Sequence, residues 1–405
     1  MNLKNIIDNK DKYAQYMVDE ITHICTKLPK RGPGSEGEKL SCEYMGEEMK
    51  KLGCDRVSVE GFKENPDSFY GWIYFTISCC FLALASFFFM PVLSIVFIAI
   101  GLTLCILQFG LYKKTVDKLF KEETGHNVAG FKKPTGEVKR RIIFNGHPDG
   151  AWEWPFKYKF TYLGFDIHMM VCFAGAFYTL AIAILKLAGV LEGDLATKLG
   201  LIGLVFAPFW FGLYFMWNKK RVVDGANDNL SGCYIGMAIL KALHDEGIEF
   251  ENTEIGVVCT GSEEAGLRGA KAWAAAHADE MKDVPTFVFS YDTIAQNEQL
   301  MVNYRDLNAT VKTDKEVGDL FFEACEELGI PCKKGFVPPL GGATDSAAFA
   351  QAGMRSTGIT ALNHALPDIY HTRLDTPEAL NPSCLADCFA ASVLALEKFD
   401  KGAKQ

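Results

Sequence analysis

The sequence predicts an α/β fold in which a mixed, mostly parallel sheet is flanked by helices and carries two inserted transmembrane helical hairpins. Two observations predict this fold. Short apolar runs with strand-like composition alternate with amphipathic helical segments, which is typical of a sheet covered by helices on both faces. Two long apolar blocks interrupt the alternation, and each is long enough for two membrane crossings of about 20 residues.

The alternating elements occupy the polar part of the chain. Residues 35–53 predict an amphipathic helix with a capping box from Ser35 to Glu38 and a stop at Gly53. Further helices are expected over residues 230–247, 315–329 and 385–399. The expected strands are VSVEGF (57–62), NVAGF (127–131), RIIFNG (141–146), EIGVVCT (254–260) and TFVFSYD (286–292).

The two apolar blocks predict four membrane crossings. The first, residues 71–112, contains no Asp, Glu, Lys or Arg and has Pro91 near its turn. The second, residues 165–217, is divided by the polar stretch KLAGVLEGDLATK. Helices buried in a soluble core are the alternative. We assign residues 69–113 and 161–218 to two hairpins, and residues 1–68, 114–160 and 219–405 to one polar domain.

Charge and cysteine content indicate where the polar domain lies. The N-terminus is charged and has no apolar signal segment, so the hairpins themselves must direct insertion. The 13 cysteines form no C-x-x-C pair, which favours reduced thiols, and a net charge of −9 argues against a nucleic-acid partner. By the positive-inside rule the polar side is cytoplasmic, because the blocks are flanked there by Lys113, Lys114, Lys157, Lys159, Lys219, Lys220 and Arg221.

Candidate site residues gather at the ends of the predicted strands, where ligand sites of α/β sheets form. His147 and Asp149 follow a strand at i, i+2 spacing, so Asp149 can accept a hydrogen bond from His147 and fix its tautomer. Each candidate alone also suits a structural, capping or surface role, but together they offer the nitrogen and oxygen ligands that zinc takes. The other candidates are Asp224 and Asp228 in VVDGANDNLSG, Glu263 and Glu264 in CTGSEEAGLRG, Asp292 in SYDT, and Tyr370 and His371 in YHTRLDTPE.

The adjacent glutamates also have a purely structural interpretation. They lie where a strand is expected to pass into a helix, and acidic residues in a first helical turn gain about 0.3–1 kcal/mol each from the helix dipole. Ser262 is then expected to be the N-cap of that helix. The segment GPGSEG (32–37) fits the dinucleotide-binding motif G-x-G-x-x-G. It follows no predicted strand, so dinucleotide binding is not expected.

In their order along the chain, the His-x-Asp, Asp, Glu-Glu, Asp and Tyr-His groups resemble the co-catalytic two-zinc aminopeptidase family. That family includes secreted bacterial leucine aminopeptidases, glutamate carboxypeptidases and glutaminyl cyclases. The resemblance extends to RGPGSEGE near the start and GGATDSAAF late in the chain. A neighbouring metallopeptidase family is the second choice, because it expects Gly-x-x-Asp-x-Lys-Gly where this chain has GANDNLSG.

The resemblance implies a zinc-aminopeptidase-like fold that holds two Zn²⁺ ions, with cobalt or manganese as other possible metals. It implies that Glu263 is the general base and that Tyr370 stabilises the oxyanion. The chain departs from the family pattern at Ser346, where many relatives carry a histidine. The implied ligands are His147 and Asp292 for one ion, Glu264 and His371 for the other, and Asp228 as the bridge.

The insertions restrict the topology. If residues before and after each apolar block bind the same ions, the chain must return to the side it left, so each block crosses the bilayer an even number of times. The second block begins just beyond the His147 loop with the aromatic stretch AWEWPFKYKFTY, so we expect the site to lie close to the membrane.

The resulting functional hypothesis is an integral, multi-pass, cytoplasm-facing two-zinc exopeptidase that hydrolyses peptide bonds, most simply an aminopeptidase. Its expected partners are a peptide or amphipathic amide substrate and the lipid bilayer; the sequence indicates no oligomeric state. Hydrolysis of N-acyl amino acids is one alternative, and a non-catalytic membrane scaffold on a peptidase fold is another. Glutaminyl cyclisation and transport are less favoured, because all five ligands are present and the apolar blocks hold few ionisable groups.

Overall fold

The computed structural model describes residues 3–363 and 368–402. The chain forms two compact units that are both assembled from separated segments. One unit comprises residues 1–66, 122–152 and 222–405, and the other comprises residues 67–121 and 153–221. We call them the sheet unit and the helical unit.

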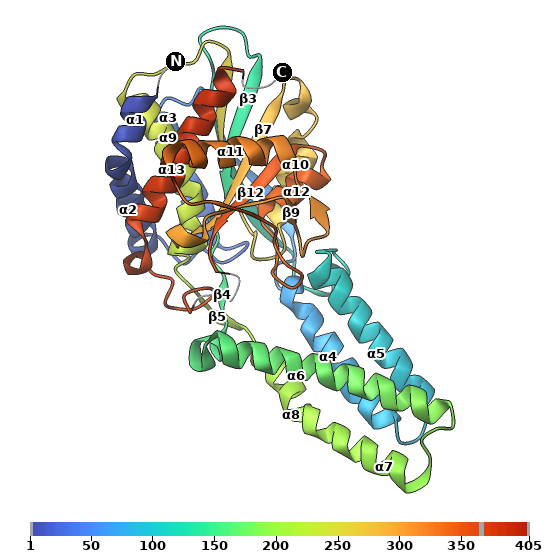
Figure 1. The fold of residues 1–405 in the computed structure, drawn as a ribbon. Helices are drawn as coiled ribbons and strands as arrows, with labels where there is room; N and C mark the ends of the chain where they lie inside the picture. The colour runs from blue at the N-terminus through green and yellow to red at the C-terminus, as the bar shows by residue number, and fades with distance from the viewer. Residues whose placement is uncertain (1–2, 364–367, 403–405) are drawn as a thin grey trace. The chain divides into compact units, whose positions relative to one another are not determined.

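The sheet unit is built on an eight-stranded mixed sheet with the order β1-β2-β6-β3-β7-β12-β8-β11 (Figure 1). Strands β6, β3, β7 and β12 run parallel at its centre, whereas β1 and β2 are antiparallel additions at one edge. The predicted fold class is therefore confirmed. The strands are β1 (Arg56–Glu64), β2 (Glu123–Lys132), β3 (Arg140–Gly146), β6 (Thr253–Thr260), β7 (Thr286–Ile294), β8 (Met301–Asn303), β11 (Lys333–Gly335) and β12 (Arg355–Ala361).

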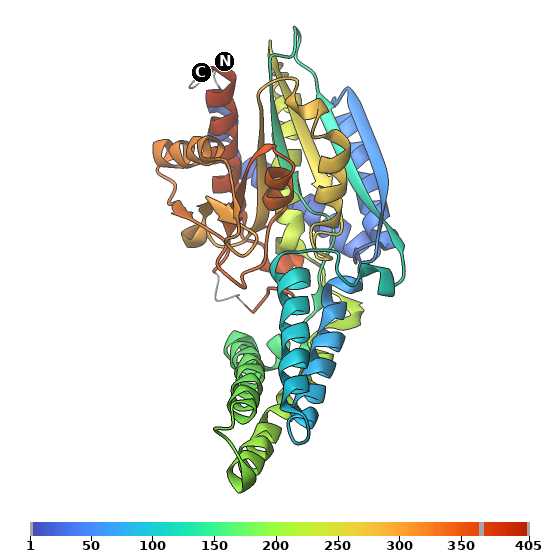
Figure 2. The same ribbon diagram turned by 90° about the vertical axis from the view of Figure 1, so that its right-hand side faces the viewer.

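Helices cover both faces of this sheet (Figures 1 and 2). Alternate residues of the central strands, such as Ile142 and Phe144 of β3, enter the main core together with α2, α3, α9, α11 and α13. On the opposite face α10 and α12 pack together, with the Trp273 ring edge-on to Phe349. The helices are α1 (Lys4–Asp8), α2 (Lys10–Lys27), α3 (Glu36–Lys51), α9 (Ser231–Asp245), α10 (Arg268–His277), α11 (Lys315–Leu328), α12 (Asp345–Gln351) and α13 (Pro382–Asp400).

Local sequence signals explain where several helices begin. Ser35 caps α3 by accepting a hydrogen bond from the Glu38 N–H at 3.2 Å, as its position predicts. The Glu38 side chain does not complete the predicted capping box and is used elsewhere, as described below. Helix α13 begins at Pro382, three residues before the expected Leu385, because Asn381 caps it and proline suits the first helical turn.

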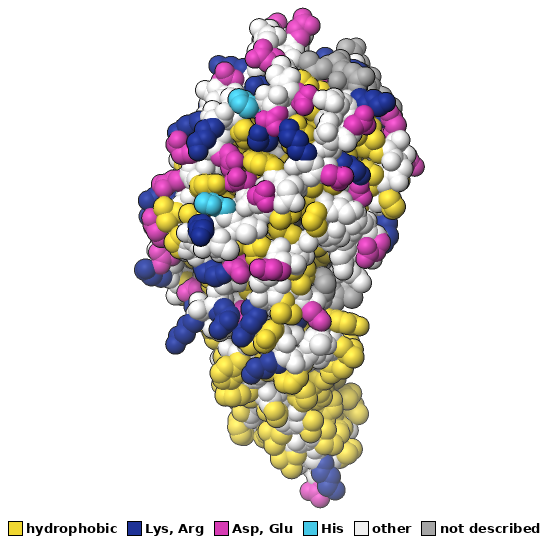
Figure 3. Space-filling model, turned by 90° about the vertical axis from the view of Figure 1, so that its left-hand side faces the viewer, with side chains coloured by type: hydrophobic (Ala, Val, Ile, Leu, Met, Phe, Trp, Pro, Cys, Tyr) yellow, Lys and Arg dark blue, Asp and Glu magenta, His cyan; other side chains and the backbone are white. Residues whose placement is uncertain are grey.

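The helical unit contains α4 (Ser68–Ser86), α5 (Pro91–Cys105), α6 (Pro155–Leu187), α7 (Gly193–Ile202) and α8 (Ala207–Gly212). Among the described residues, four helical spans are long and apolar enough to cross a membrane: 68–86, 91–110, 155–187 and 193–215. Helix α6 starts earlier than the predicted hairpin and is kinked at Thr161. Large hydrophobic side chains of this unit, such as Ile106, Val205 and Phe211, lie exposed on these spans, and Figure 3 shows apolar side chains covering this part of the chain.

Short strands complete the structure. Strands β4 (Trp152–Glu153) and β5 (Asn218–Val222) form a two-stranded sheet where the chain passes between its two units. Strands β9 (Arg305–Asp306) and β10 (Val311–Lys312) form another beside α12. The carboxyl ends of β3, β6 and β7 lie together at one end of the parallel sheet, which is where the predicted site residues are found.

Candidate metal centre

The sequence-predicted ligands converge at this end of the sheet although they are distant in the chain. Their ligand atoms form two groups of three, His147, Asp228 and Asp292 in one and Asp228, Glu264 and His371 in the other, and within each group the atoms lie no more than 4.8 Å apart. All five side chains are buried. Asp228 belongs to both groups, which is the arrangement a bridging ligand requires.

The first group is centred on His147, which directly follows β3. Its Nε2 atom lies 3.4 Å from Asp228 Oδ1 and 4.0 Å from Asp292 Oδ2. Asp292 lies near the end of β7, and its other carboxylate oxygen accepts a hydrogen bond from the Thr293 hydroxyl at 2.8 Å. The neighbouring parallel strands β3 and β7 thus bring a histidine and an aspartate to one point.

The second group is centred on His371, in the segment between β12 and α13. Its Nε2 atom lies 3.2 Å from Asp228 Oδ2 and 3.1 Å from Glu264 Oε1. The two oxygens of Asp228 therefore face different histidines. The ring of the preceding residue, Tyr370, stacks on His371 with its centroid 4.0 Å away.

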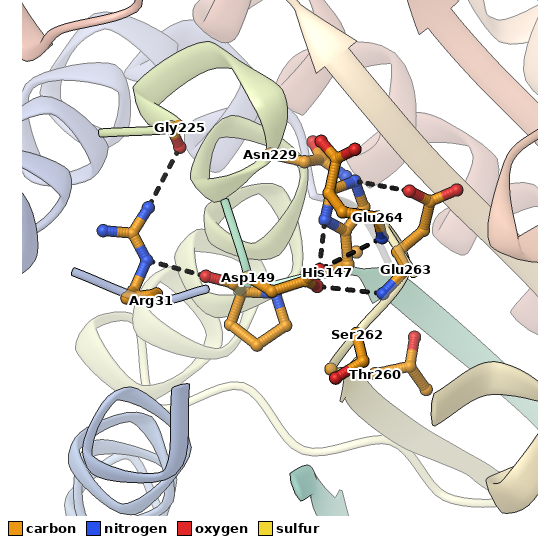
Figure 4. A network of polar contacts seen from close by, with 12 residues as sticks. Arg31, His147, Asp149, Gly225, Asn229, Thr260, Ser262, Glu263 and Glu264 are labelled. Carbon is orange, nitrogen blue, oxygen red and sulfur yellow. Dashed lines mark hydrogen bonds and ion pairs between the residues drawn. The ribbon is translucent and has the colours of Figure 1, made fainter. Parts of the chain in front are cut away.

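The adjacent glutamates point to different partners (Figure 4). Glu264 faces His371, whereas Glu263 Oε2 lies 3.8 Å from His147 Nε2. The capping interpretation is wrong: α10 begins only at Arg268, and Ser262 has a left-handed backbone (φ 54°) rather than an N-cap conformation. The two glutamates sit in a turn after β6, and this turn lets consecutive side chains diverge.

Asp149 contacts His147, as predicted, and it also contacts the turn that carries the two glutamates. Its Oδ1 lies 3.3 Å from His147 Nδ1, as the sequence spacing suggests. In addition, its two oxygens accept the backbone N–H groups of Glu263 and Glu264, each at 3.1 Å. One fully buried carboxylate thus fixes both the histidine of one group and the turn that carries the glutamates.

Asp375 is a residue of the candidate site that sequence reasoning missed. Its carboxylate accepts the backbone N–H groups of Asn227 and Asp228 at 2.8 and 3.0 Å, and it is almost fully buried. It lies four residues after His371, so it links the two segments that carry Asp228 and His371. An aspartate in a loop followed by Thr-Pro looks like an ordinary turn residue, and no sequence signal separates it from one.

The electrostatics of the site favour bound cations. Burial raises the pKa of Glu263 and of Asp292 well above the usual range. Burial also acts to lower the pKa of His371, but Glu264 and Asp228 outweigh it and raise that pKa to about 9. Buried carboxylates exceed imidazoles here, and buried charges are normally paired or coordinate metals.

Other candidate residues lie outside these two groups. Asp224 forms an ion pair with Lys30. Ser346, at the departure from the family pattern, donates a hydrogen bond to Asp306 at 2.6 Å. Partial burial and the nearby carboxylates raise the pKa of Tyr370 well above the usual range, so its hydroxyl stays protonated.

Comparison with known proteins agrees with this geometry. Residues 214–395 match the model of peptidase family M28. Among solved structures, the chain is similar to a zinc aminopeptidase from Bacillus subtilis (TM-score 0.57, 14% identity, covering 95% of this chain and 94% of the other). It is also similar to a glutaminyl cyclase from Porphyromonas gingivalis (TM-score 0.56, 10% identity, 97% and 98% coverage).

An aminopeptidase from Aneurinibacillus sp. strain AM-1 shows the same likeness, with a TM-score of 0.57 at 14% identity over 96% of this chain and 95% of the other. A search of curated protein sequences finds no match. The predicted relation to the co-catalytic zinc family is confirmed by the family match, and a metallopeptidase is the enzyme class that it supports.

Proposed function

We propose that this chain is a membrane-embedded two-zinc exopeptidase, most simply an aminopeptidase, that hydrolyses peptide bonds. The observation that carries the proposal is the convergence of five buried ligands into two groups of three that share Asp228. Histidine nitrogen and carboxylate oxygen are ligands that zinc takes, and paired metals sharing a ligand are typical of metal-dependent aminopeptidases.

The described residues fit such ions in a specific way. Among the described residues, His147 Nε2, Asp228 Oδ2 and Glu264 Oε1 are buried atoms that make no hydrogen bond of good geometry, although they lie 3.1–3.4 Å from one another's ligand atoms or from His371 Nε2. An unsatisfied buried polar atom is costly, so each such atom calls for a partner. We assign His147 and Asp292 to one ion, Glu264 and His371 to the other, and Asp228 to both. Zinc bound there would supply Lewis acidity and lower the pKa of water at the site.

Glu263 is the proposed general base. Its carboxylate lies beside the first ligand group but is not needed to complete it, since His147, Asp228 and Asp292 already supply three ligands. It would take a proton from the attacking water and return it to the leaving amine, a transfer worth about 10²–10⁴ in rate. Tyr370, with its hydroxyl protonated, is the proposed donor to the developing oxyanion.

The membrane part of the proposal depends on the helical unit. Its four spans have the length and composition of membrane helices, and lysines and an arginine flank them on the polar side. Only five residues separate Asp149 from Pro155, where α6 begins. The flanking basic residues support a cytoplasm-facing site. The short connection supports an amphipathic or membrane-resident substrate, such as a hydrophobic peptide or an N-acyl amino acid.

A peptide-library digest with the purified full-length protein in detergent tests the activity. We expect stepwise removal of N-terminal residues, read by mass spectrometry, and loss of that activity with a chelator. Glu263→Gln should abolish hydrolysis and retain the zinc content of the wild type. Unchanged turnover in this variant would reject Glu263 as the base, and a digest without products would favour a non-catalytic scaffold.

The substrate class needs a separate comparison. One peptide is offered in a soluble form and in a lipid-anchored form, with the protein reconstituted in vesicles. We expect faster hydrolysis of the anchored form. Equal rates would count against a membrane-resident substrate without affecting the peptidase proposal.

A further inference from the structure

The segment Arg31–Glu38, which has the sequence RGPGSEGE, contacts three of the loops that carry the candidate metal ligands. It holds none of those ligands itself. We call this segment the N-terminal brace. Its contacts with the loops at residues 147–150, 224–225 and 261–264 all lie within the sheet unit.

Arg31 joins two of these loops (Figure 4). Its side chain is only 1% exposed. Its Nε atom donates to the carbonyl of Pro148 at 2.6 Å, and its Nη2 atom donates to the carbonyls of Asp224 and Gly225, the latter at 3.2 Å. The Arg31 carbonyl in turn accepts the N–H of Gly150 at 2.9 Å. A planar guanidinium with five donors suits several fixed acceptors better than a lysine ammonium does.

These two loops are the ends of the second insertion. The chain leaves the sheet unit after Trp152 and returns at Val222. His147 lies before this insertion and Asp228 lies after it. The first ligand group therefore forms only if the two ends of the insertion are held close together. Closing a long loop costs conformational entropy. The Arg31 bridge, with the Val223 N–H to Ala151 carbonyl bond of 2.9 Å, provides a local closure at this point.

Glu38 and Gly34 hold the third loop. The Ser262 hydroxyl lies 2.7 Å from Glu38 Oε2 and 2.5 Å from Glu64 Oε1, so its one proton is shared between two carboxylates. The Gly34 N–H donates to the same hydroxyl oxygen at 3.1 Å. The other Glu38 oxygen accepts the N–H of His126 at 2.7 Å. Ser262 has a left-handed backbone, which costs energy in a non-glycine residue and persists only when its surroundings fix it. Glu263 and Glu264 follow Ser262 directly, so the contacts of Ser262 with Glu38, Gly34 and Glu64 help to set the turn from which they diverge.

We propose that Arg31 and Glu38 are positioning residues of the metal centre. Arg31 keeps the His147 and Asp228 loops in register across the inserted helices, and Glu38 keeps the Ser262 turn in the conformation that separates the two glutamates. The inference rests on the proposed metal centre but extends it to a segment that supplies no ligand and touches no reacting atom.

The zinc affinity of the full-length protein in detergent, measured by competition with a fluorescent chelator, tests the role of Arg31. Partners that orient metal ligands typically contribute about 10–100-fold in affinity. We expect Arg31→Gln to weaken zinc binding at least about tenfold. The matched control is Arg141→Gln, which removes another buried arginine of the sheet unit, one paired with Glu254 and Asp283. The control should lower the Tm and leave zinc affinity within about twofold.

Hydrogen exchange of the metal-free protein separates this inference from the proposed function. Arg31→Gln should speed exchange in peptides covering 146–152 and 222–230, and Glu38→Gln should do so in the peptide covering 260–268. If both variants showed the wild-type exchange rate in these peptides, the positioning role of Arg31 and Glu38 would be rejected. Zinc weakening by Arg141→Gln equal to that by Arg31→Gln would reject it as well. Should Arg31→Gln fail to fold, Arg31→Lys keeps the charge, loses the planar fork, and should show the same changes to a smaller extent. A protein that binds zinc but cleaves no peptide would reject the peptidase proposal alone.

Discussion

The most informative substitution is Asp149→Asn, because one carboxylate serves both candidate ion positions. Its oxygens accept the N–H groups of Glu263 and Glu264, and one of them faces His147 Nδ1 at 3.3 Å. The amide that replaces it has the same shape but one acceptor oxygen and no charge. Whichever way the amide is turned, at least one of the two backbone N–H groups then faces an NH₂ group.

The expected loss follows from those contacts. A hydrogen bond to a charged group contributes about 1.5–3 kcal/mol, and a donor left unsatisfied in the interior costs a similar amount. Losing one such bond corresponds to about a 10- to 100-fold change, since about 1.4 kcal/mol is tenfold. We therefore expect Asp149→Asn to lower kcat/KM by about this factor and to weaken zinc binding.

The assay compares kcat/KM on the best peptide from the library digest with zinc affinity measured by chelator competition. Asp314→Asn is the matched control, because Asp314 also accepts two backbone N–H groups, those of Glu316 and Val317, at the start of α11. The control should keep wild-type values. If Asp149→Asn stays within about twofold of the wild type in both measurements, the described hydrogen bonds do not organise the site.

Three further predictions concern other residues of the sheet unit. Gly232→Ala should destabilise the protein by about 1–3 kcal/mol in a denaturation experiment, because a Cβ there would lie 2.4 Å from Asn229 Oδ1; wild-type stability would contradict that packing. Burial raises the pKa of Glu48 to about 7, and Tyr16 donates to it at 2.7 Å. The protonated form of Glu48 stabilises the fold fully below the unfolded-state pKa of about 4.5, and this stabilisation is lost as pH rises through 7. Glu48→Gln should therefore raise the Tm relative to the wild type more at pH 8 than at pH 5. Equal Tm shifts at the two pH values would refute this. Tyr370→Phe should lower kcat about 10²–10³-fold with little change in KM, and an unchanged kcat would remove Tyr370 from the proposed chemistry.

Much of the fold could be predicted because its signals are local. The central strands are short apolar runs, and β3, β6 and β7 lie where residues 141–146, 254–260 and 286–292 predict them. His147, Glu264 and Asp292 could be marked as candidates because they lie at the ends of such strands, and parallel strands bring their carboxyl ends to one edge. The full ligand set, with Asp228 and His371, came from the family resemblance. The four apolar spans were equally visible as long stretches poor in charge.

The parts that escaped prediction depend on tertiary contacts. Nothing in CTGSEEAGLRG shows that Ser262 adopts a left-handed backbone, because its side chain contacts Glu38 and Glu64, which lie about two hundred residues earlier in the chain. The partners of Asp375 and Arg31 are mainly backbone groups of distant loops, and backbone groups leave no mark in the sequence. The second oxygen of Asp149 escaped notice for the same reason.

The central claim is that two metal ions share Asp228, and zinc-edge anomalous diffraction from crystals of the full-length protein tests it most directly. Two anomalous peaks are expected, one in contact with His147 and Asp292, the other with Glu264 and His371, and both in contact with Asp228. A single peak, or zinc bound away from these five side chains, would contradict the proposed centre.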